Sequence, residues 1–278
     1  MRKVLFLITF IPLSLLSCLG QGAEEEFFMA LYHLDLPHAG KRLEAIREDD
    51  PVKGIMGQLQ LLWWEHISRD ASLSPLLQHL DSIEELLPEV PIELSLYYHG
   101  MRLKIYRSQK QYYRAWKAWK AIEAHEEACI AANDSENAQF LSGIYYCTKG
   151  ELQRHFTLRL REGASVRKSM EKGLLLLERS SHASNKAIRY QSHYLLMRLY
   201  AKHYKNYHQS LAHSTPLIEA FPENYLFRYF HIRYLQETDK KKEASRSLHR
   251  GLEALSKSYL HPAQKAFGQE LLRQLSAD

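Results

Sequence analysis

The sequence predicts an all-α protein, an α-solenoid of stacked antiparallel helical hairpins with about 12–13 helices. Three observations lead to this fold class. Strand signals are almost absent, apolar residues recur every three or four positions along the whole chain, and the interruptions between periodic segments are short. Short connections favour antiparallel neighbours, because a helix that follows a brief turn packs back along the preceding one.

The chain begins with a segment typical of an export signal. Arg2 and Lys3 precede an uncharged, mostly apolar run over residues 4–16, which is too short to span a bilayer. We therefore expect a signal peptide within residues 1–23 and an exported protein. The protein would be periplasmic, or it would be held on a membrane by a lipid anchor.

The last part of this segment, Leu15-Leu16-Ser17-Cys18, resembles the bacterial lipobox. That resemblance implies cleavage before Cys18 and lipidation of its side chain. Leu16 is an unusual residue in such a box, so ordinary cleavage after Gly20 or Ala23 stays open as an alternative. Two or more acyl chains would give lasting membrane attachment.

The first seven expected helices are separated by residues that end helices. Pro51, the proline-flanked segment 88–91 and the pair Asn133-Asp134 interrupt the apolar periodicity. Between these breaks the apolar residues keep helical spacing. The expected helices span 24–34, 38–48, 52–68, 73–87, 91–108, 110–132 and 135–161.

The remaining six helices follow from the same kinds of break. Gly163, the serine-rich segment 181–184, Pro222 and the pair His261-Pro262 separate periodic stretches. The expected helices span 164–181, 184–204, 207–221, 223–238, 240–257 and 262–275. In the last one, Phe267 faces inward and Gln264 outward, as in a polar capping helix.

Two consecutive segments, 191–224 and 225–258, repeat with a period of about 34 residues. Small and apolar residues recur where two helices would cross. The positions are Ala201, Ser210, Leu217 and Pro222 in the first segment, and Ile232, Leu235, Ala244, Leu248 and Gly251 in the second. The pattern resembles the tetratricopeptide repeat. The resemblance implies a helical-repeat domain over 24–278, with these two segments as its best-formed repeats and 262–275 as its capping helix.

Catalytic patterns are missing from the sequence. No Gly-rich phosphate loop and no nucleophile elbow is present. The nearest approach to a metal motif is His125-Glu126-Glu127-Ala128-Cys129, in which His125 and Cys129 share a helix face without an identifiable third ligand. We interpret that segment as helix packing. The sequence therefore predicts no catalytic residue, no metal and no cofactor.

Charge and composition fit a protein-binding role better than nucleic-acid binding. The chain has 37 basic and 32 acidic residues, hence a formal charge of +5, without a concentrated basic motif. Export also separates the protein from nucleic acid. A protein or peptide of the cell envelope is the expected partner, and the possible lipid anchor adds contact with a membrane.

The leading hypothesis is a non-catalytic scaffold or adaptor for protein–protein interaction in the bacterial cell envelope. The resemblance places Lys202, His203, Tyr229 and Arg233 on one concave groove, which could receive an extended peptide or its carboxylate. The alternative is a glycan- or peptidoglycan-binding module whose exposed aromatic rings stack on sugars. A hydrolase with a metal near His125 is the third hypothesis.

Overall fold

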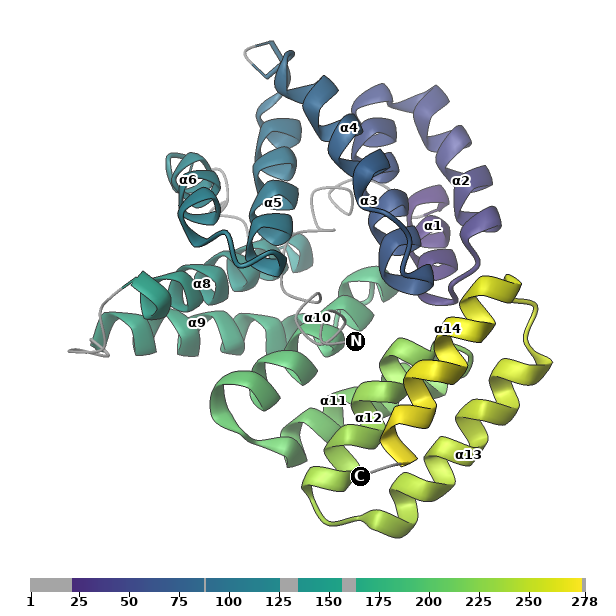
Figure 1. Cartoon of the computed structure of the whole chain (residues 1–278). Helices are drawn as coiled ribbons and strands as arrows, with labels where there is room; N and C mark the ends of the chain where they lie inside the picture. Colours follow the sequence, from purple (N-terminus) through teal and green to yellow (C-terminus); the bar gives the residue numbers. More distant parts are fainter. Residues whose placement is uncertain (1–21, 88, 126–134, 157–163, 277–278) are drawn as a thin grey trace.

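The computed structural model describes residues 22–276 except 88, 126–134 and 157–163 (Figure 1). Within these residues the protein is all-helical, with thirteen α-helices and no strand, and consecutive helices pack in adjacent pairs. The predicted all-α class is thereby confirmed. No helix in the described part is long and apolar enough to cross a membrane.

The helices follow the predicted breaks closely. They are α1 (Ala23–Tyr32), α2 (Leu36–Asp49), α3 (Pro51–Arg69), α4 (Ser74–Glu84), α5 (Ile92–Ser108), α6 (Tyr112–Glu123), α8 (Glu136–Phe156), α9 (Ala164–Ser180), α10 (Lys186–Leu199), α11 (Tyr207–Ala220), α12 (Tyr225–Glu237), α13 (Lys241–Lys257) and α14 (Pro262–Arg273). A π-helical turn, Tyr200–Tyr204, continues α10, and a 3-10 turn, Gln274–Ser276, follows α14.

Asparagine and aspartate side chains define where several helices begin. Asp35, Asp50, Asn185, Asn206 and Asn224 each accept a hydrogen bond from a backbone N–H in the first turn of α2, α3, α10, α11 and α12. Such a bond satisfies one of the donors that a helix leaves unpaired at its start. The cap at Asp50 stands directly before Pro51, one of the breaks predicted from the sequence.

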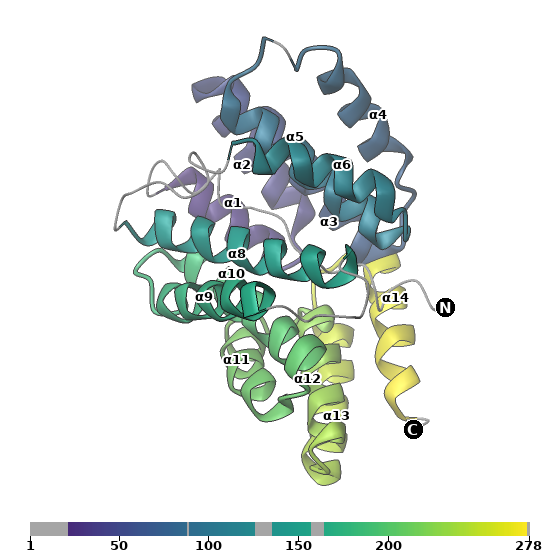
Figure 2. The ribbon, with the colours of Figure 1, turned by 90° about the vertical axis from the view of Figure 1, so that its left-hand side faces the viewer.

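Helices α8 and α9 lie side by side and form a long antiparallel hairpin (Figure 2). Glycines allow the two backbones to approach closely. A Cβ atom on Gly173 of α9 would lie 2.7 Å from the backbone nitrogen of Cys147 in α8. Cys147 is buried and free. Cys129 lies outside the described residues.

The first and last parts of the chain meet in one core. The ring of Tyr32 in α1 lies 5.4 Å from that of Phe221 and 5.5 Å from that of Phe227, measured between centroids. Asn224 donates to the carbonyl oxygen of Tyr32 at 2.7 Å, and the Tyr225 hydroxyl donates to that of Ser68. Helices from opposite ends of the sequence therefore share buried contacts.

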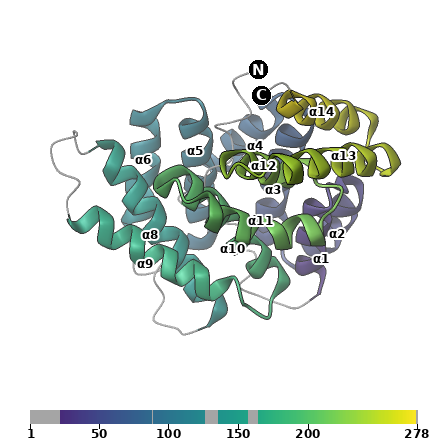
Figure 3. The ribbon, with the colours of Figure 1, turned by 90° about the horizontal axis from the view of Figure 1, so that it is seen from below.

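Helix α14 lies against α3, α12 and α13, and Figure 3 shows it beside α13. Its Gln264 side chain is buried and donates to the Leu34 carbonyl at 3.1 Å, which corrects the expectation that this residue faces outward. Phe267 packs against Tyr225 as expected for an inward position. The last helix thus joins the two ends of the chain as well as covering α13.

Candidate functional site

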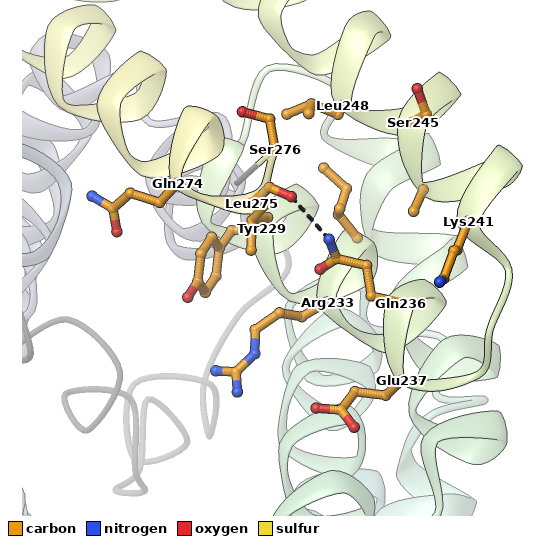
Figure 4. A pocket seen from close by; sticks show the side chains of 12 residues that line it. Tyr229, Arg233, Gln236, Glu237, Lys241, Ser245, Leu248, Gln274, Leu275 and Ser276 are labelled. Carbon is orange, nitrogen blue, oxygen red and sulfur yellow. Dashed lines mark hydrogen bonds between the residues drawn. The ribbon is translucent and has the colours of Figure 1, made fainter. Parts of the chain in front are cut away.

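A pocket of about 690 Å³ lies between α12, α13 and the 3-10 turn at the end of the chain (Figure 4). Tyr229 and Arg233, two of the residues predicted to bind a partner, line it. Both helices that form its walls belong to the predicted repeat 225–258.

Helix periodicity explains how the walls are built. The residues that α12 contributes lie three or four positions apart, as do those of α13, so each helix presents one face to the pocket. Ile232 and Ala244 are buried at its base. Arg233 is half-buried, whereas Glu237 and Lys241 are exposed at the edge. The site therefore combines an apolar base with a charged rim.

One hydrogen bond fixes the third wall. Gln236 of α12 donates through Nε2 to the carbonyl oxygen of Leu275 at 2.9 Å, drawn as a dashed line in Figure 4. This bond holds the end of the chain against α12. A pocket that is already bounded on three sides loses less conformational entropy when a ligand binds.

The guanidinium of Arg233 is available for an acidic ligand. Among the described residues, no carboxylate oxygen lies within 4.0 Å of its nitrogen atoms, and Glu237 on the next turn makes no ion pair with it. An Arg guanidinium recognises carboxylates through two parallel N–H donors. The arrangement can therefore hold an extended segment that carries an apolar and an acidic side chain.

Lys202 and His203 occupy a different environment. Both lie in the π-helical turn and contact Glu151 of α8, with the Lys202 Nζ atom 2.8 Å from Oε1 and His203 Nε2 on the same oxygen. Neither residue lines the pocket of Tyr229 and Arg233. The structure thus brings the four predicted groove residues together as two pairs.

Glu151 is the centre of a buried ionic cluster that the sequence did not reveal. Its side chain is fully buried, and Arg107 of α5 places Nη2 2.7 Å from Oε2. Burial raises the pKa of the Glu151 carboxyl, but Arg107, His203 and Lys202 together outweigh burial and hold the pKa well below its usual range. Glu151 is therefore ionised and joins α5, α8 and the π-helical turn.

Two histidines, a glutamate and a tyrosine form a hydrogen-bonded chain across α9, α10, the π-helical turn and α11. His193 and His213 approach at 3.1 Å between Nδ1 atoms, and His213 Nε2 lies 3.2 Å from Glu178, which also accepts from the Tyr200 hydroxyl at 2.8 Å. Burial, with His213 nearby, lowers the pKa of His193 to about 4. Sequence spacing could not reveal this chain, because its members come from different helices.

No set of three His, Cys, Asp or Glu residues in the described part of the chain has the geometry of a metal site. His125 ends the described segment after α6, and its proposed companion Cys129 lies outside the described residues. The metal hypothesis at His125 thus remains a prediction from sequence.

Comparison with known protein-family models, curated proteins and solved structures returns no match for this chain. The geometry of the pocket and the chemistry of its residues are therefore the basis for a functional interpretation.

Proposed function

We propose that this protein is a helical-repeat scaffold that binds a protein partner in the bacterial cell envelope, without catalysing a reaction. In this proposal the stacked helical pairs form a tetratricopeptide-like α-solenoid. The pairwise packing of consecutive helices and the regular length of the two C-terminal segments support it.

The pocket between α12 and α13 carries the proposal. It offers an apolar base at Ile232, the ring of Tyr229, and a guanidinium at Arg233 that has no acidic partner among the described residues. An extended peptide segment with one apolar and one acidic side chain complements these features. Lys241 at the edge adds a second positive charge for the same ligand.

The envelope location rests on the N-terminal sequence alone. Residues 1–21, including Cys18, lie outside the described residues. We propose that the segment directs export and that Cys18 carries the lipid anchor. Release of a Cys18→Ser variant into the soluble periplasmic fraction would support the anchor, and unchanged membrane fractionation would contradict it.

Arg233→Ala tests the proposed pocket. We expect at least a tenfold loss of partner affinity, because a hydrogen bond to a charged group contributes about 1.5–3 kcal/mol. Purified protein would be crosslinked in envelope extracts and its partners quantified by mass spectrometry. Arg179→Ala on α9 is the matched control, since Arg179 is likewise a helical arginine but does not line the pocket.

An equal recovery of partners by Arg233→Ala and Arg179→Ala would refute the pocket assignment.

Recovery of no protein by the wild type would favour the second candidate, a glycan-binding module. The feature that favours that candidate is Tyr113 on α6, which is 68% exposed and has the Lys117 ammonium 4.9 Å from its ring centroid. Aromatic rings presented in this way can stack on sugars. Glycan-array binding lost in Tyr113→Ala would then support it.

A further inference from the structure

A second pocket, of about 280 Å³, lies on another face of the α12–α13 pair. Its polar lining differs from that of the larger pocket in being strongly cationic. These polar residues are Arg228 and His231 from α12, and Glu243, Arg246, Ser247 and Arg250 from α13.

The three arginines lack acidic partners. In the described part of the chain, no carboxylate oxygen lies within 4.0 Å of the guanidinium nitrogens of Arg228, Arg246 or Arg250. The one acidic residue of the lining, Glu243, instead has its Oε2 3.8 Å from Lys240 Nζ. The pocket therefore concentrates positive charge that the fold itself does not neutralise.

Arg228 is built into the base of this pocket. Its exposed fraction is 8%, and its Nη2 donates to the Pro222 carbonyl at 3.1 Å, while its buried Nε has no hydrogen-bond partner among the described residues. The side chain packs directly against Gly251, where an added Cβ atom would lie 2.3 Å from Arg228 Cδ. Burial and the nearby Arg250 lower the pKa of Arg228. A buried cation of this kind is stabilised by an anionic ligand.

Ser247 adds a hydroxyl to the donor set. Ser247 is 8% exposed, and its Oγ has no hydrogen-bond partner in the described part of the chain. A serine hydroxyl can donate to an oxyanion. His231 is held by Ser214, whose Oγ lies 2.8 Å from its Nδ1. Guanidinium and hydroxyl donors thus converge from two helices on one small cavity.

We propose that this pocket binds a phosphoryl group, as inorganic phosphate or as a phosphate monoester. A dianion matches the excess of guanidinium groups better than a carboxylate does, and a tetrahedral group can accept bonds from donors on both helices. This site is distinct from the proposed peptide pocket, so phosphate binding does not depend on that function.

Equilibrium dialysis of the full chain against radiolabelled inorganic phosphate tests the proposal. We expect saturable binding at one site per chain. Arg250→Gln should weaken binding about tenfold, because it removes a charge-assisted hydrogen bond. Glu243→Gln should strengthen binding, since it removes the only carboxylate of the lining. Arg179→Gln on α9, away from both pockets, should have the affinity of the wild type.

Arg250 and Glu243 are exposed, so these variants should fold even if replacement of the buried Arg228 prevents folding. The proposal is overturned if the wild type does not bind phosphate saturably, if Arg250→Gln binds as Arg179→Gln does, or if Glu243→Gln does not bind more tightly. Competition by glycerol 3-phosphate, compared with competition by phosphatidate vesicles, distinguishes a soluble ester from a lipid headgroup as the source of the phosphoryl group.

Discussion

Individual buried ionisable residues are compensated in different ways in this protein. Glu151 is surrounded by Arg107, Lys202 and His203. Their positive charges offset the cost of burying the ionised carboxylate. His231 instead lies close to cations. Burial first, and then Arg228 and Lys240, lower its pKa to about 4. The free energy of unfolding must therefore depend on pH through the protonation of His231.

The direction of that dependence follows from the two states. An unfolded histidine has a pKa near 6.5, whereas His231 in the folded protein stays neutral down to about pH 4. Between these values the unfolded chain binds more protons, so the free energy of unfolding falls as pH is lowered. One residue contributes at most about 1.4 kcal/mol per pH unit.

Urea denaturation between pH 7 and pH 5 measures this effect with His231→Asn. We expect the variant to lose less stability over this interval than the wild type, because asparagine does not titrate. Its absolute stability at pH 7 can differ without affecting the comparison. An identical slope for both proteins would show that His231 does not carry the predicted proton linkage.

At the same scale, Tyr229 and Arg233, two of the residues that the resemblance placed in one groove, line the same pocket. They lie four positions apart on one continuous helix and therefore share a face. Lys202 and His203 lie within the π-helical turn, which changes the angular position of its residues relative to an α-helix. Their partner Glu151 lies about fifty residues away in sequence, beyond what periodicity can detect.

At the scale of helices, local sequence was a better guide. Capping residues such as Asn206 and Asn224 and the prolines at the helix starts act within one turn, so they can be recognised without tertiary information. The expected helix 184–204 is correct in extent, but it contains the unpredicted π-helical turn. The expected helix 110–132 is too long: α6 ends at Glu123 and a turn follows at Ala124 and His125, while residues 126–134 lie outside the described residues.

The α8–α9 hairpin gives a prediction about helix packing. A Cβ atom on Gly173 would lie 2.7 Å from the backbone nitrogen of Cys147 and 2.9 Å from the carbonyl oxygen of Gly143. Backbone atoms cannot move aside as a flexible side chain can. We expect Gly173→Ala to lower the free energy of unfolding by about 1–3 kcal/mol, as overpacked cores do.

Gly40→Ala on α2 is the matched control, because no atom beyond its chain neighbours and its own helix backbone lies within 4 Å of the Cβ position there. Alanine is the better helix former, so this change should raise the free energy of unfolding by about 0.5–1 kcal/mol. Thermal and urea denaturation of both variants would measure the contrast. If Gly173→Ala also stabilised the protein, the close approach of α8 and α9 would be wrong.

At the scale of the whole molecule, closure between the ends of the chain is the main feature that the sequence did not predict. Gln264 and Leu34, which are hydrogen-bonded, stand 230 residues apart. Helical periodicity describes neighbouring pairs, and it contains no information about which distant pairs meet. The closed arrangement holds α12, which lines both pockets, against the N-terminal helix α1.

The proposed function requires a protein partner in the pocket between α12 and α13. Site-specific photocrosslinking in intact cells tests for that partner, with the crosslinking residue placed at Ser245 in the pocket and, as control, at exposed Ser256 on the same helix outside it. We predict a discrete crosslinked product from position 245 that is lost when Arg233→Ala is added, and no such product from position 256. Equal crosslinking from both positions, or a product that persists in Arg233→Ala, would contradict the claim.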